Sequence, residues 1–219
     1  MEQFVNKVAV IPARGGSKRI PRKNVRMFAG KPMIAHSILA AQQSELFDHI
    51  FVSTEDDKIA DVSKTFGAEI IQRPAELADD YTATIPVIRH AIEWMSETNI
   101  KSDAVCCIYG CAPLVLPEDI INGFNYLING KWEFVCSATE FEYPIQRGFQ
   151  IKGDNSLSML DEDNYHKRTQ DLKPIFHDAD KFYWGRTKAW LENDMVFSNK
   201  CASVKFPRFR VQVIDNEED

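Results

Sequence analysis

Short apolar runs and amphipathic stretches alternate along the first two thirds of the chain. The run VAVI at 8–11, which ends at Pro12, is typical of a buried strand. Similar apolar runs predict strands at 49–53, 68–72, 104–109 and 134–138. Apolar residues three or four positions apart predict helices at 32–43, 56–66, 85–95 and 117–128. This alternation predicts an α/β fold with a mostly parallel sheet.

The carboxyl ends of the predicted strands indicate where a ligand binds. Open parallel sheets bind ligands at this edge, because the loops that follow the strands meet there. The residues predicted at this edge are Pro12, Ser53, Arg73, Gly110 and Thr139. We therefore expect the functional site among these strand ends.

The alternation stops after Thr139. The turn sequence GDN at 153–155 indicates a hairpin, and strand-like pieces return at 182–184 and 202–206. We interpret residues 140–185 as an insertion that forms a cap or a dimer arm. The length suits a single domain, residues 1–219, that contains this insertion.

The composition is that of an ordinary globular protein. Hydrophobic residues make up 44% of the chain and charged residues 26%. No apolar run approaches the roughly 18–20 residues of a membrane-spanning helix, and no signal-peptide pattern precedes the first predicted strand. We expect a cytoplasmic protein that does not bind a membrane.

The five cysteines are odd in number and lack the paired spacing of a zinc site. They are Cys106, Cys107, Cys111, Cys136 and Cys201. A metal site or a thiol nucleophile is one interpretation. Burial as small hydrophobic residues within strands is the favoured one.

The net charge of -6 is unevenly distributed along the chain. Residues 1–31 contain eight Lys or Arg and a single acid, Glu2, so the remaining chain is strongly acidic. A basic segment on an acidic protein indicates a polyanion site. The chain shows no nucleic-acid-binding motif, and its overall charge repels a long phosphate backbone, so we do not expect a nucleic-acid partner.

The strongest chemical motif is the sequence ARGGSKRIPRKN at 13–24, directly after the first predicted strand. Gly15 and Gly16 let main-chain amides approach phosphate oxygens, and Lys18 and Lys23 supply positive charge. The P-loop pattern and the G-x-G-x-x-G fingerprint are both absent from the sequence. A glycine turn with solvated basic residues is the alternative, which the number of basic residues disfavours. We therefore predict a nucleoside triphosphate site at 12–24.

This stretch resembles the N-terminal motif of the CMP-sialic acid synthetase family, the cytidylyltransferases that activate nine-carbon acidic sugars. The resemblance continues in VSTED at 52–56, RPAEL at 73–77, DYTAT at 80–84 and ID at 214–215. Four later motifs resemble the branch of the family that acts on pseudaminic acid. They are YPIQR at 143–147, RTQDL at 168–172, HDA at 177–179 and FYW at 182–184.

The resemblance implies a three-layer, Rossmann-like nucleotide-diphospho-sugar transferase fold. It implies a nucleotidyltransferase that moves CMP from CTP to the anomeric hydroxyl of a nonulosonic acid, such as pseudaminic acid, and releases pyrophosphate. It also implies a homodimer in which the insertion of one chain reaches the active site of the other. The alternatives are another acidic acceptor, such as sialate or legionaminate, and a non-catalytic nucleotide-binding paralogue.

The resemblance also implies the roles of individual site residues. Those expected at the CTP phosphates and sugar are Arg14, Ser17, Lys18, Lys23 and Asn24, of which Arg14, Lys18 and Lys23 act in catalysis. Those expected around the cytosine are Arg73, Thr82 and Thr84. Those expected to face the acceptor sugar are Gln146, Arg147, Arg168, Gln170 and His177. The competing interpretations are a surface cation for Arg73 and a salt-bridged surface for Arg168.

Two aspartates, two residues apart near the C-terminus, bind magnesium in the family. Asp215 matches the second aspartate, whereas Val213 stands at the position of the first. In a strand, residues two apart point to the same side, so we expect positions 213 and 215 to face one metal. We predict Mg2+ bound by Asp215, with waters and CTP oxygens as its other ligands. A second departure is Asp180-Lys181, where the family usually has Gly-Gln.

Overall fold

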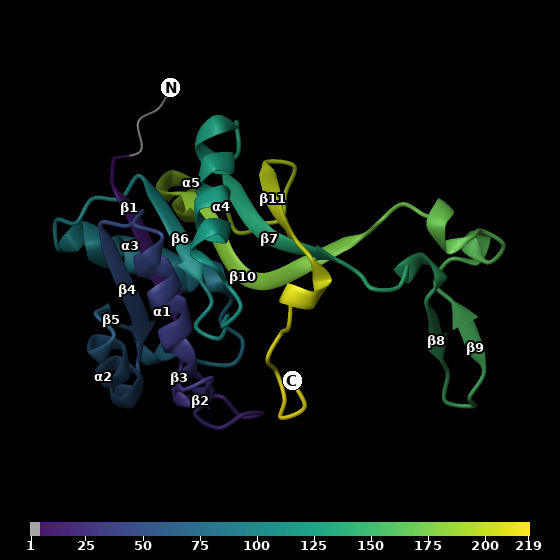
Figure 1. The fold of residues 1–219 in the computed structure, drawn as a ribbon, viewed down its shortest axis with the longest axis horizontal. Helices are drawn as coiled ribbons and strands as arrows, with labels where there is room; N and C mark the ends of the chain where they lie inside the picture. The colour runs from purple at the N-terminus through teal and green to yellow at the C-terminus, as the bar shows by residue number, and fades with distance from the viewer. Residues whose placement is uncertain (1–4) are drawn as a thin grey trace.

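A seven-stranded sheet forms the centre of the computed structural model, which describes residues 5–219 (Figure 1). Its strands are β1 (Lys7–Pro12), β4 (His49–Thr54), β5 (Glu69–Gln72), β6 (Ala104–Ile108), β7 (Phe134–Glu140), β10 (Phe176–Arg186) and β11 (Cys201–Phe206). They lie in the order β11-β7-β10-β6-β1-β4-β5. Strand β10 runs antiparallel to both of its neighbours, and the other pairs are parallel. The predicted mostly parallel sheet is confirmed.

Helices cover both faces of this sheet. They are α1 (Met33–Gln43), α2 (Asp57–Thr65), α3 (Thr84–Glu97), α4 (Pro117–Asn129) and α5 (Thr187–Glu192). On one face, α1, α2 and α4 bury a cluster that includes Ile34, Ile59 and Phe124. On the other face, α3 and α5 bury Ile88 and Trp190. The predicted three-layer α/β arrangement is confirmed. None of the helices in residues 5–219 is long and apolar enough to cross a membrane.

Strand β1 lies between β4 and β6 and supports the basic loop that follows it. Its residues from Val8 to Ile11 are fully buried. Burial of one such side chain contributes on the order of 1.5–3 kcal/mol, so the strand is a rigid base for the loop. The loop leaves β1 at the carboxyl edge of the sheet and ends in a short 3-10 helix, Lys23–Val25.

Helix α2 begins beside this loop, at a position that its own sequence determines. The Asp56 carboxylate accepts a hydrogen bond from the Ile59 N–H at 3.0 Å and so caps the first turn. Gly67, with a φ of 84°, follows the last turn in the left-handed conformation that glycine favours. The cap places Glu55 and Asp56 next to the basic loop.

A separate arm projects from the main body of the molecule (Figure 1). It contains the antiparallel hairpin of β8 (Phe149–Ile151) and β9 (Leu157–Met159), which pair only with each other. The hairpin turn falls at 152–156, where the sequence indicates one. The polypeptide leaves the sheet at the end of β7 and returns to it at the start of β10.

The boundary of the predicted insertion is wrong at its C-terminal end. We assigned residues 140–185 to it, but 176–185 belong to β10 in the central sheet. The sequence shows this strand only as the strand-like piece at 182–184, because β10 is irregular before that point. Its register against β7 shifts between Asp178 and Tyr183, and Asp180 has a left-handed φ of 49°. The alternation of buried and exposed positions is interrupted there, and polar residues lie within the strand.

A short hairpin and a short helix have no counterpart among the predicted elements. Strands β2 (Met27–Phe28) and β3 (Lys31–Pro32) form a small hairpin that leads into α1. Helix α5 follows β10 and packs its Trp190 ring against Phe134 of β7. Both are too short for a periodic pattern to identify them.

Candidate active site

The glycine pair of the basic loop lies against the start of α2. The Gly15 N–H donates to the Glu55 carboxylate at 2.7 Å. A Cβ at position 15 would collide with the carboxylate of Asp56, so only glycine fits this approach. A Cβ at Gly16, by contrast, would meet no atom within 4 Å. Gly15 therefore lets the loop pack closely against Glu55 and Asp56, whereas Gly16 faces open space.

The loop and the C-terminal segment enclose a cavity of about 350 Å³. We call it the phosphate cavity. Its lining residues are Arg14, Ser17, Lys18, Arg19, Lys23, Asn24, Asp80 and Asp215. All five residues predicted at the CTP phosphates and sugar therefore lie around one cavity, together with the predicted metal ligand.

Two acidic side chains hold the cations of the phosphate cavity. The Asp80 carboxylate forms ion pairs with Arg14 and Lys18. Asp215 lies 2.9 Å from the Arg19 guanidinium and 3.7 Å from Lys23 Nζ. Hydrogen bonds from the basic partners, first of all Lys18, lower the pKa of Asp80. A bound triphosphate can replace Asp80 and Asp215 as the partner of these cations, because it is also negatively charged and has a higher charge density.

A second cavity of about 230 Å³ adjoins the first, and Arg14, Lys23 and Asn24 line both. We call it the nucleoside cavity. Its other lining residues are Pro12, Arg73, Thr82, Ala83, Thr84, Val87, Tyr109, Gly110 and Cys111. The three residues predicted around the cytosine thus lie together, next to the phosphate cavity. Apart from the shared residues and Arg73, the nucleoside cavity is lined by uncharged residues, and it opens onto the cations of the phosphate cavity.

Arg73 is not the surface cation of the competing interpretation, because only 5% of it is exposed. Its Nε donates to Ser53 Oγ at 3.2 Å, and its Nη2 donates to the Ser53 carbonyl at 2.5 Å. Burial lowers its pKa, while the nearby charge of Glu55 raises it. A guanidinium held in this way has a fixed direction, which suits recognition of a planar base.

The aromatic wall of the nucleoside cavity was missed by the sequence analysis. Tyr109 Oη lies 3.3 Å from Thr84 Oγ1 and donates to Tyr183 Oη at 3.2 Å. Tyr183 in turn donates to the Asp178 carboxylate. Burial raises the pKa of both tyrosines, so both hydroxyls stay protonated near neutral pH. Tyr109 ends an apolar run, where it cannot be distinguished from a core residue by sequence.

The cysteines fit the interpretation as buried strand residues. Cys106, Cys107 and Cys136 are buried, and all five are free thiols. Cys111 lines the nucleoside cavity, but burial raises its pKa to about 11, so it remains a neutral thiol. The nucleophile and metal interpretations gain no support here.

The five residues predicted to face the acceptor sugar line neither of these two cavities. Four of them lie in the arm, which projects away from β1 (Figure 1). Arg168 is an exposed partner of Asp171, with two contacts of 2.7 and 3.0 Å. Gln146 donates to the Lys173 carbonyl at 2.7 Å. Gln170 lines a separate cavity of about 300 Å³. The His177 ring packs against the ring of Phe141. Arg147 lies in the short 3-10 helix next to Gln146. Within one chain, the predicted acceptor and nucleotide residues are therefore apart.

The expected strand around the metal residue is wrong. Residues 211–215 have no regular secondary structure. Lys23 Nζ donates to the Ile214 carbonyl at 2.5 Å, so the segment bonds to the basic loop rather than to a neighbouring strand. The argument that positions 213 and 215 share one side of a strand does not hold. Only Asp215 of the two lines the phosphate cavity.

The donor set fits a magnesium ion only if the substrate supplies ligands as well. Among residues 5–219, no group of three or more His, Cys, Asp or Glu side chains is placed to hold a metal ion. Asp215 does offer a hard carboxylate oxygen on the phosphate cavity, and its side chain is 41% exposed. Magnesium commonly uses one or two carboxylates together with substrate phosphates and waters.

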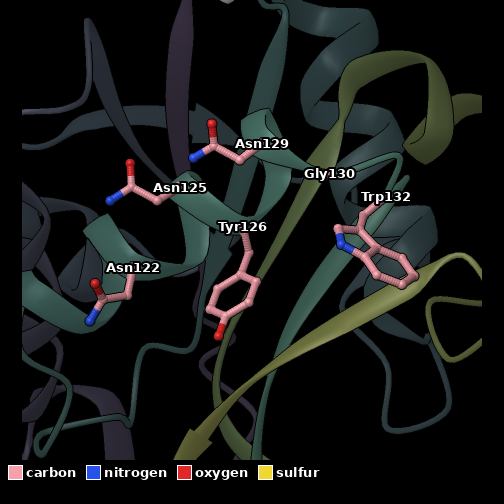
Figure 2. A pocket seen from close by; sticks show the side chains of 6 residues that line it. All are labelled: Asn122, Asn125, Tyr126, Asn129, Gly130 and Trp132. Atoms are coloured by element: carbon pink, nitrogen blue, oxygen red, sulfur yellow. The ribbon is translucent and has the colours of Figure 1, made fainter.

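A larger cavity of about 390 Å³ lies on the outer side of α4 and does not suit a nucleotide (Figure 2). Its lining residues are Asn122, Asn125, Tyr126, Asn129, Gly130 and Trp132. The three asparagine side chains and the Tyr126 ring project from the helix, and the Trp132 ring lies beyond its C-terminal end (Figure 2). None of the lining residues is charged, so the cavity lacks the cations that a triphosphate requires.

Comparisons with known proteins agree with this geometry. Residues 8–206 match the family model described as cytidylyltransferase. The chain is 42% identical to the pseudaminic acid cytidylyltransferase of Campylobacter jejuni subsp. jejuni over 213 residues, which are 97% of this chain and 92% of that protein. It is 41% identical to the CMP-N,N'-diacetyllegionaminic acid synthase of Legionella pneumophila over 126 residues, 57% of this chain and 54% of the relative.

A solved structure shares the fold. CMP:2-keto-3-deoxy-manno-octonic acid synthetase in complex with CTP superimposes with a TM-score of 0.69 at 17% identity, over 97% of this chain and 94% of that one. Cytidylyltransferases that use CTP generally work with a divalent metal. The family match over most of the chain and the full-length relative lead to one conclusion: this chain is a nucleotidyltransferase and belongs to the cytidylyltransferase family.

Proposed function

We propose that this enzyme transfers CMP from CTP to the anomeric hydroxyl of pseudaminic acid and releases pyrophosphate. The observation that carries the proposal is the pair of adjoining cavities joined at Arg14, Lys23 and Asn24. Apart from these shared residues, charged side chains line the phosphate cavity, whereas Arg73 is the one charged residue among the others that line the nucleoside cavity. A pyrimidine nucleoside triphosphate has the same division into a neutral base and an anionic tail. The acceptor is proposed from the similarity to the Campylobacter enzyme.

The proposed arrangement places the cytosine beside Arg73, Thr82 and Thr84. A pyrimidine edge offers a carbonyl acceptor and an amine donor, which guanidinium and hydroxyl groups can complement. The triphosphate then extends along the basic loop. The junction of the two cavities is the natural position for the α-phosphate, because it lies between the base and the terminal phosphates.

In the proposed reaction, the acceptor oxygen attacks the α-phosphorus and the bond to the β-phosphate oxygen breaks. Negative charge develops on the phosphoryl oxygens and on the leaving pyrophosphate. Arg14, Lys18 and Lys23 stabilise this charge from fixed positions, and a hard divalent metal at Asp215, proposed to be Mg2+, polarises the phosphoryl group when bound. The protein otherwise acts by holding both reactants in line.

We also propose that the active unit is a homodimer. The arm exposes several large apolar side chains: Tyr143, Ile145, Phe149, Ile151, Leu157 and Leu160. Apolar groups gathered on one projecting element are typical of an interface. The separation of the arm residues Gln146, Arg147, Arg168 and Gln170 from the nucleotide cavities of their own chain supports an arm that serves the partner. The proposed compartment is the cytoplasm, whose reducing conditions suit the five free thiols.

The test is a panel of acceptors. The purified protein is incubated with CTP, Mg2+ and pseudaminic, legionaminic or sialic acid, and products are detected by mass spectrometry. We expect CMP-pseudaminate as the main product, with one pyrophosphate released per CMP-sugar. A main product from legionaminic or sialic acid would replace the proposed acceptor. A protein that releases no pyrophosphate with any of the three would overturn the proposed function.

A further inference from the structure

A continuous chain of hydrogen bonds runs from the wall of the nucleoside cavity to a carboxylate on β10. It starts at Thr84 Oγ1, in the first turn of α3, and reaches Tyr109 Oη at 3.3 Å. Tyr109 Oη lies 3.2 Å from Tyr183 Oη, and Tyr183 bonds to the Asp178 carboxylate. Thr84 and Tyr109 line the cavity, whereas Tyr183 and Asp178 are not among its lining residues. The chain therefore connects the cavity wall to a carboxylate outside the cavity.

The direction of this chain is fixed from its Asp178 end. A carboxylate only accepts hydrogen bonds, so the Tyr183 hydroxyl donates to Asp178. The other Asp178 oxygen accepts the Asp180 N–H at 3.0 Å, so both oxygens serve as acceptors. Each tyrosine hydroxyl has a single proton. Because the proton of Tyr183 points to Asp178, Tyr183 accepts from Tyr109, and Tyr109 in turn accepts from Thr84.

The Thr84 hydroxyl is consequently left with acceptor sites alone for a ligand. Its one proton points to Tyr109, and Thr84 Oγ1 has no other hydrogen-bond partner among residues 5–219. A threonine hydroxyl has one donor and two acceptor sites, so only lone pairs remain. Turning the proton toward a ligand would break the bond to Tyr109. The cavity wall thus presents a hydrogen-bond acceptor at Thr84.

Cytosine and uracil differ in the group that such an acceptor distinguishes. Position 4 of cytosine is an amine, which donates a hydrogen bond, whereas position 4 of uracil is a carbonyl, which accepts one. The two bases are both single rings of nearly equal size, so the volume of the cavity does not separate them. A site built to pair with one polar group rejects an analogue that lacks it, because the polar groups of the site are then left unpaired.

We propose that the chain from Asp178 through Tyr183 and Tyr109 sets Thr84 as a hydrogen-bond acceptor, and that this makes the enzyme select CTP over UTP. Thr84 contacts position 4 of the base. Tyr183 and Asp178 are positioning residues that act through it from outside the cavity. The inference rests on the proposed function for the location of the base, but not on the identity of the acceptor sugar.

The test compares the binding of CTP and UTP by isothermal titration calorimetry, without an acceptor sugar. The quantity measured is the ratio of the Kd for UTP to the Kd for CTP, which we expect to be at least about a hundred in the wild type. Tyr183→Phe removes the group that accepts the Tyr109 proton. Tyr109 can then donate to Thr84, and the Thr84 proton is free to face the base. We expect the ratio to fall at least about tenfold, through a lower Kd for UTP.

Asp178→Asn should reverse the whole chain. The asparagine oxygen still accepts the Asp180 N–H, so the amide group of the side chain faces Tyr183 and donates to it. Each hydroxyl then donates in the opposite direction, and the Thr84 proton points at the base. We therefore expect the Kd ratio of Asp178→Asn to fall below that of Tyr183→Phe.

Two further variants test Thr84 itself. Thr84→Ser keeps the hydroxyl and should keep the wild-type ratio. Thr84→Val has no hydroxyl and should lower the ratio through a higher Kd for CTP, with little gain for UTP. Phe197→Leu is the matched control, because the Phe197 ring packs against Tyr183 without joining the chain, and its ratio should equal that of the wild type. Thermal melting verifies that each variant is folded.

The same Kd ratio in the wild type, Tyr183→Phe and Asp178→Asn would overturn the proposal. A wild type that binds CTP and UTP equally well would overturn it too. A wild type that binds neither nucleotide would overturn the proposed function as well. A wild type that selects CTP but forms no CMP-sugar from pseudaminic acid would overturn only the proposed acceptor and would support the role of Thr84.

Discussion

The Asn24 side-chain amide donates a hydrogen bond to the Arg14 main-chain carbonyl at 2.9 Å, and so joins the two ends of the basic loop. The oxygen of the same amide accepts from Cys111 Sγ at 3.2 Å, which ties the loop to the end of β6. Asn24 is only 7% exposed. One buried side chain thus links the two cavities that meet at this point.

Replacement of Asn24 by alanine should loosen this link. The variant leaves the Arg14 carbonyl without its donor, which typically costs about 1–3 kcal/mol for a buried group. We expect a lower melting temperature and a KM for CTP raised several-fold. Asn125→Ala, on the exposed side of α4, is the matched control and should change neither quantity. A wild-type KM in Asn24→Ala would show that the loop keeps its shape without this bond.

Lys18 should act on the triphosphate rather than on stability. Its side chain is 81% exposed and its ion-pair partner is Asp80 on the same cavity. We expect Lys18→Ala to lower kcat/KM for CTP at least about tenfold, which corresponds to about 1.4 kcal/mol of transition-state stabilisation. Because exposed ion pairs contribute little to folding, the melting temperature should stay nearly constant.

The control for Lys18 is another exposed lysine with an ordinary ion pair. Lys64 on α2 pairs with Asp61 at 3.4 Å, away from both cavities. Lys64→Ala should therefore retain the kinetics of the wild type. If Lys18→Ala and Lys64→Ala behave alike at low CTP concentration, Lys18 has no role at the phosphates.

The nucleoside cavity should select CTP over ATP and GTP. Its volume of about 230 Å³ favours a single-ring base, and its buried guanidinium at Arg73 is fixed by Ser53. We expect kcat/KM for CTP to exceed that for ATP by at least about a hundredfold, or roughly 2.7 kcal/mol. Arg73→Lys should reduce the preference, because a lysine cannot reproduce the planar fork. Equal turnover of CTP and ATP by the wild type would contradict the assignment of the cavity.

The basic loop could be located from the sequence because the residues that identify it are close together along the chain. A buried strand, a glycine pair and a run of cations follow one another within residues 8–24. The burial of Arg73 could not be predicted in this way. It depends on the pairing of β4 with β5, which brings Ser53 beside a residue twenty positions later. The pairing of Asp80 with Lys18 likewise joins segments that are distant along the chain.

The two wrong predictions share a physical cause. Strand β10 was assigned to the insertion because only its end at 182–184 has a strand-like pattern, and the register shift before Tyr183 removes the regular alternation. Residues 211–215 were expected to form a strand, but Lys23 bonds to the Ile214 carbonyl and holds the segment over the phosphate cavity. In both places a local pattern was overridden by contacts made at the site.

Removal of the Asp215 charge should weaken the response to magnesium. The carboxylate lines the phosphate cavity and faces Lys23 at 3.7 Å. We expect Asp215→Asn to raise the half-saturating Mg2+ concentration at least about tenfold, because a neutral amide is a poorer ligand for a hard cation. The wild type should lose its activity in excess chelator and regain it on addition of Mg2+. An Asp215→Asn variant with an unaltered Mg2+ titration would show that the metal lies elsewhere.

The exposed apolar side of the hairpin should be required for dimer formation. Phe149, Ile151 and Leu157 are 55%, 67% and 61% exposed in the single chain. We expect the wild type to scatter light as a dimer at micromolar concentration, and the triple variant with serine at these positions to be a monomer. The far-ultraviolet circular dichroism should be retained, because the hairpin lies outside the central sheet. A monomeric wild type with full activity would contradict the proposed assembly.

Mixed dimers can decide whether the arm serves its own chain or its partner. Lys18→Ala damages a nucleotide cavity and leaves the arm intact, whereas Arg168→Ala damages the arm and leaves the cavity intact. If the arm acts on the partner, a dimer with one chain of each kind has one fully intact site, composed of the cavity of one chain and the arm of the other. Random exchange makes half of the dimers mixed, so the mixture should recover about a quarter of wild-type activity, although each variant alone is impaired. If the arm acts on its own chain, every site carries one defect and mixing recovers nothing. The projection of the arm away from β1, with Arg168 paired locally to Asp171, favours the first outcome (Figure 1).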